Sequence, residues 1–259
     1  MNILAIGDVI GKPGRQALTQ LLPSVKRAYG IDFTIVNAEN IAGGIGVTPE
    51  TASELLEAGA DVLTSGNHVW AHKEMIPCLD GQMPIIRPLN YPPGVPGKGS
   101  IIKKGVLVVN LIGRTFMNNY DCPFRAMDAL LTGLKDRPRI IIVDFHAEAT
   151  SEKVAMGRYL DGRVTAVLGT HTHIGTIDSQ VLPGGTAYVT DIGMTGPIDS
   201  VIGDDIESVL KRFLTQLHHR LPAGTGRAEL NAIIVKIDDI NGRATGIERI
   251  QRKTNECPE

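Results

Sequence analysis

Short runs of consecutive apolar residues alternate with longer stretches of helical periodicity in the first third of the chain. The first run covers Ile3 to Ile6, and the next two cover Phe33 to Val36 and Val62 to Thr64. Between them, apolar residues recur at spacings of three and four, as in a helix with one buried face. This alternation predicts a βαβαβ unit whose strands are parallel and buried on both faces.

Two helices are predicted between these strands. Gly11 to Gly14 is interpreted as a turn, and the first helix follows it and stops at Gly30. Its apolar face consists of Leu18, Leu21, Leu22, Val25 and Tyr29. The second helix begins at Thr48, a capping residue followed by proline, and ends near Gly59.

The middle of the chain mixes hairpins with further helices and strands. Pro84 to Pro96 is rich in proline and is predicted to be a long surface connection. Ser100 to Lys103 and Val106 to Ile112 are predicted to form an antiparallel hairpin across Lys104 and Gly105. A helix, a strand, a second helix and a second strand are predicted next, over Cys122 to Leu134, Arg139 to Phe145, Glu152 to Leu160, and Val164 to Leu168.

The last third repeats this mixture. A helix is predicted from Asp204 to about His219. Hairpins are predicted on either side of it, at Val181-Leu182 with Ala187 to Val189 and at Leu230 to Ile237 with Ala244 to Ile250. Neither a repeat nor a linker divides the sequence, so we expect one α/β domain over residues 1–259. Its economical architecture is two sheets packed face to face, with helices outside.

Composition narrows the classes of function. Apolar residues make up 42% of the 259 residues, and the net charge of -2 argues against a general polyanion binder. Cys78, Cys122 and Cys257 lack paired spacing and are interpreted as reduced thiols. Neither a signal peptide nor a membrane span is expected, because Met1 to Asp8 has no basic flank and no apolar run approaches roughly 18 residues. A cytoplasmic protein is therefore expected.

Polar residues with metal-binding chemistry follow the predicted strands. They are Asp8, Glu39, Asn40, Asn67, His146, His171 and His173. Each has a simpler explanation as a helix cap, a turn residue or a surface loop residue. Together, however, three imidazoles, two carboxylates and two amide oxygens exceed the needs of one ion. Because strand ends of a parallel sheet share one edge, the set predicts two ions side by side, bridged by a carboxylate such as Glu39 or by a water.

His68 directly follows Asn67 and is predicted to donate a proton to a leaving alkoxide, although it could instead simply pack there. His72 is placed at the start of a helix, and His218 and His219 at the end of one; no chemistry is assigned to them. The segment Gly43–Gly46 is interpreted as a flexible loop, since it lacks the Lys-Ser/Thr of a phosphate-binding loop. Four cations could steer a phosphate but are interpreted as surface residues, namely Lys12, Arg15, Arg87 and Arg114.

Six blocks that run in order along the chain resemble the YmdB-type branch of the calcineurin-like metallophosphoesterases. They are Gly7–Arg15, Asn37–Asn40, Gly66–His68, Asp144–Glu148, Gly169–His173 and Thr190–Gly196. The Gly-Asn-His and Gly-x-His-x-His pieces are general to the superfamily, whereas Asn-Ala-Glu-Asn is specific to the branch. The resemblance implies a four-layer α-β-β-α sandwich of two mixed sheets with a two-metal phosphodiesterase site.

The resemblance also implies a division of the ligands. One ion would take Asp8, Glu39, Asn40 and His173, and the other Glu39, Asn67, His146 and His171. His68 would be the proton donor, and the ions would be iron, manganese or magnesium, with iron favoured. The superfamily's usual Asp-x-His has Ile10 in place of its histidine here, and Glu39 replaces the usual bridging aspartate. An amide oxygen thus stands where an imidazole is usual. The ligand set of the first ion is therefore harder, that is, richer in oxygen donors.

The expected function is hydrolysis of 2′,3′-cyclic or 3′,5′-cyclic nucleotides by a hydroxide held between two metal ions. A phosphomonoesterase with the same centre is one alternative, and a regulator that binds nucleotide or RNA with little hydrolysis is another. The expected partner is a small phosphodiester, with no membrane and no nucleic acid beyond a short RNA. Association of copies of the chain stays open.

Overall fold

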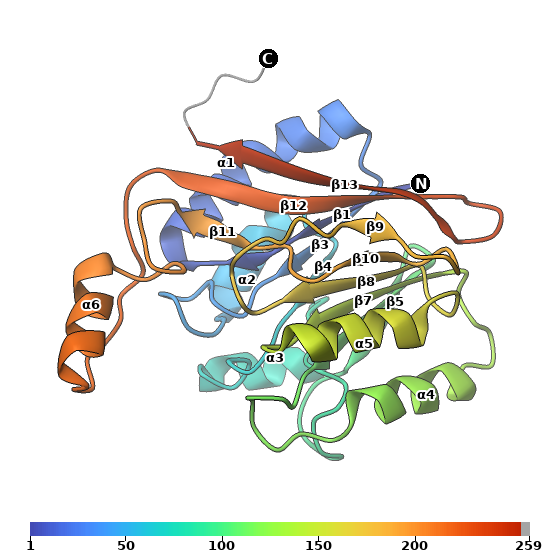
Figure 1. The fold of residues 1–259 in the computed structure, drawn as a ribbon, viewed down its shortest axis with the longest axis horizontal. Coiled ribbons are helices and arrows are strands. Elements are labelled where there is room, and N and C mark those ends of the chain that lie inside the picture. The colour runs from blue at the N-terminus through green and yellow to red at the C-terminus, as the bar shows by residue number, and fades with distance from the viewer. Residues whose placement is uncertain (255–259) are drawn as a thin grey trace.

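Thirteen strands form two mixed sheets in the computed structural model, which describes residues 1–254 (Figure 1). The first sheet has the order β2-β11-β12-β1-β3-β4, and β13 also pairs with β12. Its strands are β1 (Asn2–Ile6), β2 (Asp8–Val9), β3 (Phe33–Asn37), β4 (Val62–Thr64), β11 (Met194–Pro197), β12 (Ala228–Ile237) and β13 (Ala244–Lys253). β1, β3 and β4 are parallel, as the βαβαβ pattern predicts.

The second sheet has the order β5-β6-β7-β8-β10-β9. Its strands are β5 (Ser100–Lys103), β6 (Val106–Ile112), β7 (Ile140–His146), β8 (Ala166–Thr170), β9 (Gln180–Val181) and β10 (Ala187–Val189). β6, β7 and β8 are parallel, whereas β5 and β6 form the predicted hairpin. At its turn, Lys104 and Gly105 both have positive φ, as a tight two-residue hairpin turn requires.

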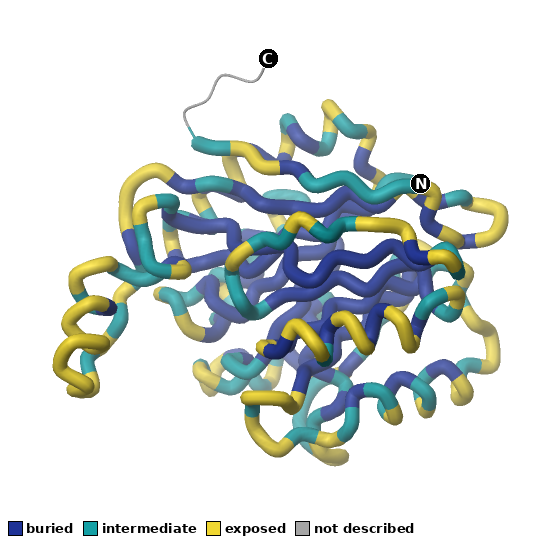
Figure 2. Tube along the Cα trace, in the orientation of Figure 1, coloured by how far each residue is buried: buried dark blue, intermediate teal, exposed yellow. Residues whose placement is uncertain are grey.

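The helices cover the outer faces of the two sheets, except for α6, which projects from them (Figures 1 and 2). They are α1 (Gly11–Tyr29), α2 (Pro49–Glu57), the 3₁₀ helix η1 (Lys73–Met75), α3 (Ile76–Asp80), α4 (Pro123–Gly133), α5 (Thr150–Leu160) and α6 (Ile206–Thr215). Leu18 and Leu22 of α1 pack with Leu4 on one outer face, and Met127 and Met156 pack on the other. Among the described residues, no helix has the length and apolar character needed to cross a membrane.

A third apolar cluster fills the space between the sheets. Ile3, Phe33 and Ile35 of the first sheet meet Val108 and Ile142 of the second there, all nearly inaccessible to solvent. Because strand residues alternate between faces, neighbours of these residues pack against the helices instead. The predicted α-β-β-α sandwich is confirmed, and it brings the carboxyl ends of β1, β3, β4, β7 and β8 to one edge.

The predicted turn at Gly11 to Gly14 is wrong, because these residues form the first turn of α1. The backbone N–H of Gly14 donates to Ile10 O at 2.9 Å, the bond pattern of a helix. Pro13 is tolerated because the first turn of a helix leaves backbone donors unpaired anyway. Gly14 also lets α1 approach β11, since a Cβ at that position would lie 2.4 Å from Thr195 O.

The predicted surface connection from Pro84 to Pro96 is partly wrong. Ile85 and Ile86 are buried, and Ile86 donates its N–H to Leu63 O at 2.9 Å beside β4. Arg87 is buried as well, contrary to the surface position expected for it. Its guanidinium donates to Pro88 O at 2.7 Å and Pro96 O at 3.2 Å, so it ties the loop together.

The helix predicted from Asp204 to about His219 is shorter than expected and spans Ile206–Thr215. Gln216 adopts a left-handed conformation with φ of 57°, which ends the helix. α6 projects from the body of the molecule, and Val209 is its one buried residue (Figures 1 and 2). His218 and His219 therefore lie beyond the helix, and the expectation that they end it is wrong.

Candidate metal centre

The structure brings all seven predicted ligand residues to the shared edge of the two sheets. The first sheet supplies Asp8 in β2, Glu39 and Asn40 after β3, and Asn67 after β4. The second sheet supplies His146 at the end of β7, and His171 and His173 directly after β8. All the oxygen donors thus come from one sheet and all the imidazoles from the other.

His146 lies at the middle of one group of donors. Its Nε2 is 3.1 Å from Glu39 Oε1, 3.1 Å from Asn67 Oδ1 and 3.0 Å from His171 Nδ1. Ligand atoms of Glu39, His146 and His171 all lie within 4.8 Å of one another. Such a spacing suits donors that surround one cation.

The other ring nitrogen of His146 is committed to a structural bond. Nδ1 lies 2.9 Å from Thr170 Oγ1, and the threonine hydroxyl donates to Asp144 Oδ1 at 2.7 Å. A proton on Nδ1 completes this chain and leaves Nε2 with its lone pair free for a metal. Chains of this kind fix the tautomer and orientation of histidine ligands.

A second group of donors surrounds His173. Its Nε2 is 3.3 Å from the Asn40 amide and 3.9 Å from Asp8 Oδ1, while Nδ1 lies 2.6 Å from Ile202 O and donates to it. Asp8 Oδ1 is buried and has no hydrogen-bond partner among the described residues. A buried acceptor without a donor is costly, and a cation would satisfy it. These donors therefore fit a metal ion.

Glu39 belongs to both groups. Its Oε1 is 3.1 Å from His146 Nε2 and 3.2 Å from Asn40 Nδ2. Gly66 makes room for this carboxylate, because a Cβ there would lie 2.2 Å from Glu39 Oε2 and 2.3 Å from His146 Nε2. The glycine of the Gly-Asn-His block is thus required by close packing against two donors.

Charges in this buried cluster shift one another strongly. Burial raises the pKa of Asp8 to about 6. Burial also acts to raise the pKa of Glu39, but the His146 imidazolium outweighs it and lowers that pKa to about 2. Burial opposes a charged His146, yet the Glu39 carboxylate raises its pKa to about 9. The Glu39 carboxylate and the His146 imidazolium therefore stabilise each other's charge.

His171 is shifted the other way. Burial, followed by the charge of His146, lowers the pKa of His171 to about 3. A neutral imidazole is the form that binds a metal, so this ring is already in the form a ligand needs. Its Nε2 lies 3.0 Å from Glu148 Oε2 at the rim of the site.

His68 lies beside the donors without joining either group. Its Nδ1 is 2.8 Å from Asn40 Oδ1, and its backbone N–H donates to Glu39 Oε2 at 3.3 Å. The side chain is 37% exposed, compared with 0% for His146. His68 lines a cavity of about 880 Å³, which also includes Glu39, Asn40, His171 and His173. It is therefore accessible to a molecule bound at the centre.

The sequence reasoning missed a buried ion pair beneath the His-Thr-His turn. Lys153 Nζ donates to Asp191 Oδ2 at 2.6 Å, and both side chains are at most 1% exposed. The same oxygen accepts the Thr172 hydroxyl at 2.8 Å and the Thr172 N–H at 3.2 Å. His171 and His173 have φ of 99° and 65°, which non-glycine residues rarely adopt. The ion pair of Lys153 and Asp191, termed the clamp, therefore holds a strained turn in place. A lysine spaced three residues from Met156 on a buried helix face was the signal that could have revealed it.

The four cations considered for phosphate binding do not line the cavity. Lys12 and Arg114 are exposed elsewhere, and Arg15 pairs with Glu54 at 2.6 Å.

The loop Gly43–Gly46 does reach the cavity, through Gly43 and Gly44. Cys78 and Cys122 are free thiols, and Cys257 lies outside the described residues.

A family model described as YmdB-like protein matches residues 4–250. The chain belongs to the YmdB-like family. It is 47% identical over 254 residues to a protein of Bacillus subtilis (strain 168) named 2′,3′-cyclic-nucleotide 2′-phosphodiesterase, with 96% of each chain covered.

Two solved structures have the same fold. A hypothetical protein from Thermus thermophilus superimposes with a TM-score of 0.91 at 44% identity, covering 98% of this chain and 99% of that one. A structure described as a novel phosphatase from Mycoplasma pneumoniae has a TM-score of 0.92 at 33% identity, with 98% and 93% covered. The fold and the family expected from the sequence are both confirmed.

Proposed function

We propose that this phosphoesterase hydrolyses 2′,3′-cyclic nucleotides at a centre of two metal ions. That the chain is a phosphoesterase follows from its family and its named relatives. The substrate comes from the Bacillus subtilis relative, which is similar over nearly its whole length. Activity on 3′,5′-cyclic nucleotides is part of the same proposal. Both kinds of substrate contain a cyclic phosphodiester, and they differ only in the ribose oxygens to which the phosphorus is bonded.

One observation carries the two-ion proposal: the donors form two groups that share Glu39. The first ion would be held by Asp8, Glu39, Asn40 and His173, and the second by Glu39, Asn67, His146 and His171. A carboxylate that lies close to donors of both groups is suited to bridging two cations. The Asn40 amide can present its oxygen after a half-turn, because the two amide orientations are nearly equal in shape.

When bound, two such ions supply Lewis-acid chemistry: they polarise the phosphoryl oxygens and make a water nucleophilic near neutral pH. The chain itself fixes the imidazoles, through Thr170 for His146 and Ile202 O for His173. After the half-turn, the Asn40 amide N–H would face His68 Nδ1 and donate to it, so Nε2 would carry the ring proton and deliver it to the leaving alkoxide. The cavity admits the substrate to these groups.

Iron is the ion we favour, with manganese or magnesium as the alternatives. The second group has two imidazoles, which suit iron. The first group has one imidazole among oxygen donors, so its ligand set is harder. The location that we propose is the cytoplasm, where the thiols of Cys78 and Cys122 stay reduced.

Metal analysis combined with a substrate panel tests the proposal. The purified protein should contain about two ions per chain and should hydrolyse a 2′,3′-cyclic nucleotide faster than the matching nucleoside monophosphate. A protein with one ion per chain would overturn the two-ion centre. A preference for the monophosphate would favour a phosphomonoesterase, which is the second candidate because the similar Mycoplasma pneumoniae structure is described as a phosphatase.

A further inference from the structure

The cavity at the metal centre continues beyond the proposed ligands. Its volume of about 880 Å³ lies near the upper end of the range of about 300–1,000 Å³ for small-molecule sites. The metal-binding side chains lie on one side, and the segment from α6 to Leu221 lines the other. A cyclic mononucleotide at the ions would therefore leave part of the cavity unfilled.

Basic side chains line this second side. They are Arg212, His218, His219 and Arg220, all within nine positions of one another. None of the four side chains makes a hydrogen bond or an ion pair with another residue in the described part of the chain, residues 1–254. Asp204 shares the cavity and lies near Arg212, but no salt bridge within 4.0 Å joins them. Two guanidinium groups are thus available to a ligand.

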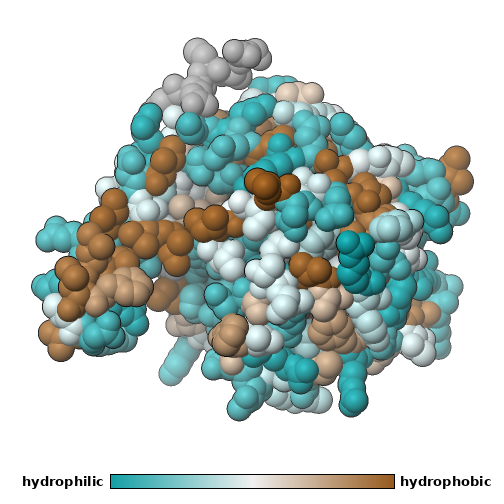
Figure 3. Space-filling view, viewed as in Figure 1, coloured by the Kyte–Doolittle hydropathy of each residue, from teal (hydrophilic) through white to brown (hydrophobic). Residues whose placement is uncertain are grey.

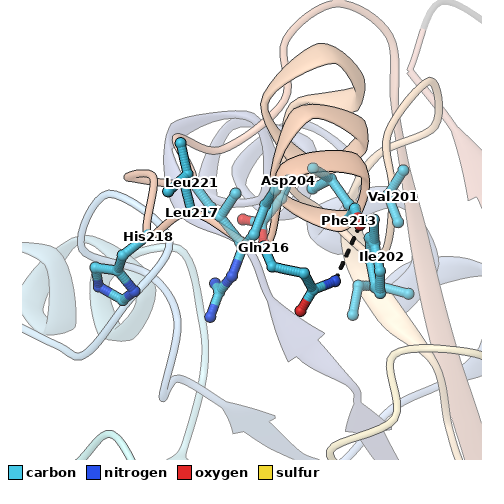
Figure 4. A pocket seen from close by; sticks show the side chains of 10 residues that line it. Val201, Ile202, Asp204, Phe213, Gln216, Leu217, His218 and Leu221 are labelled. Atoms are coloured by element: carbon cyan, nitrogen blue, oxygen red, sulfur yellow. Dashed lines mark hydrogen bonds between the residues drawn. The ribbon is translucent and has the colours of Figure 1, made fainter.

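His219 gives an independent indication of a ligand. Its Nε2 is buried, yet it has no hydrogen-bond partner among the described residues. A nitrogen that has lost water without gaining a partner is costly, so such atoms are rare in proteins. Because His219 lines the cavity, a turn of its ring would bring this nitrogen to an anionic oxygen bound there. Figure 4 shows a neighbouring pocket, which shares Arg212 and His218 with the cavity; in that view His218 points away from Leu217 and Leu221.

We propose that this wall, termed the basic wall (Arg212, His218, His219 and Arg220), binds a second phosphate of the substrate. The preferred substrate is then an oligonucleotide whose 3′ end is a 2′,3′-cyclic phosphate, with the next phosphodiester on the basic wall. Arginine forks are well suited to phosphate oxygens. The reaction is the proposed one: water adds to phosphorus, the P–O2′ bond breaks, and O2′ leaves as a hydroxyl.

This inference rests on the proposed function and is tested by three substrates. They are adenosine 2′,3′-cyclic phosphate, the same compound with a 5′-phosphate, and the dinucleotide ApA ending in a 2′,3′-cyclic phosphate. We expect kcat/KM about tenfold higher for the last two, equivalent to about 1.4 kcal/mol. The preference should decrease as salt screens the charges.

The double variant Arg212→Gln/Arg220→Gln should bring the three kcat/KM values to within about twofold of one another. Lys211→Gln is the matched control, because Lys211 is exposed on the same helix and does not line the cavity. It should keep the tenfold preference. His219→Gln, which removes one ring without changing an arginine, provides a second test of the basic wall and should also reduce the preference.

The outcomes separate the two proposals. Equal kcat/KM for all three substrates in the wild-type protein, with clear hydrolysis of each, would overturn the second-phosphate site and leave the proposed function standing. No hydrolysis of any of them would overturn the proposed function itself. A preference that survives in both the double variant and His219→Gln would show that the basic wall does not recognise phosphate.

Discussion

At the scale of single residues, Glu39 is the group on which both proposed ions depend. It is buried, with Oε1 within 3.2 Å of donors in each group. Glu39 follows β3, a buried strand that ends at the edge shared by the two sheets, and this places its carboxylate there. A change at this residue therefore affects the two ions together.

Glu39→Gln should lose both ions, because a neutral amide neither bridges two cations nor balances their charge. Elemental analysis of the purified variant should find well below one ion per chain. Glu54→Gln is a matched control, since Glu54 pairs with Arg15 away from the centre. A variant that keeps one full equivalent of metal would contradict a shared ligand.

His68→Ala should keep its metal but lose turnover by about 10²–10⁴-fold on cyclic nucleotides, the usual contribution of a general acid. The loss should be much smaller for a p-nitrophenyl phosphodiester, whose leaving group needs no proton. Comparing kcat for the two substrates in the wild type and the variant measures this difference. An equal loss on both would mean that His68 acts in another way.

At the scale of elements, the turn after β8 depends on the helix before it and on a loop after it in the sequence. Lys153 comes from α5 and Asp191 from the segment after β10, and they meet beneath Thr172. Neither residue binds a predicted ion. Their role is to hold two neighbouring histidines in conformations that the backbone alone disfavours.

Asp191→Asn should weaken metal binding by about 10–100-fold, the usual effect of losing a group that orients ligands. Titration of the metal-free variant with Mn²⁺ by calorimetry measures this directly. Asp161→Asn is the control, because Asp161 likewise accepts from a loop N–H, that of Gly184 at 2.8 Å, but away from the centre. Asp191→Asn binding Mn²⁺ as tightly as Asp161→Asn would show that the clamp serves stability alone.

The elements show what could be predicted from the sequence. Strands such as β1 and β3 are short runs buried on both faces, so their ends, and with them Asp8 and Glu39, could be located. The end of α6 could not, because its apolar residues are largely exposed and no core contact defines the helix. Lys153 was missed because its partner Asp191, 38 positions away, is set by tertiary structure. Arg87 was misplaced because it is enclosed by its own irregular loop, through Pro88 O and Pro96 O, and no periodic pattern reports such a loop.

At the scale of the whole molecule, the predicted centre joins the two sheets. Oxygen donors come from one layer and imidazoles from the other, with an apolar core between the layers. α6 stands apart from this body, and its exposed apolar face forms a patch on the surface (Figure 3). The expectation of one domain over residues 1–259 stays a prediction.

Removal of the ions by a chelator should lower the melting temperature by about 10–20 °C. Each of the two ions, bound at 100 times its Kd, contributes about 2.7 kcal/mol, and each kcal/mol shifts a chain of this size by about 2–4 °C. Calorimetry with and without chelator measures the shift, which added Mn²⁺ should reverse. Glu39→Gln should not respond to the chelator; an equal shift in that variant would place the effect elsewhere.

The separation of the donors along the chain has a consequence for folding. The hydrogen bond from the His171 N–H to Asp8 Oδ2 joins the two layers and spans 163 positions of sequence. No early local structure can assemble such a set. Uptake of a spectroscopically visible ion such as Co²⁺ during refolding would therefore time one event, the docking of the two halves of the sandwich, which secondary-structure signals do not resolve.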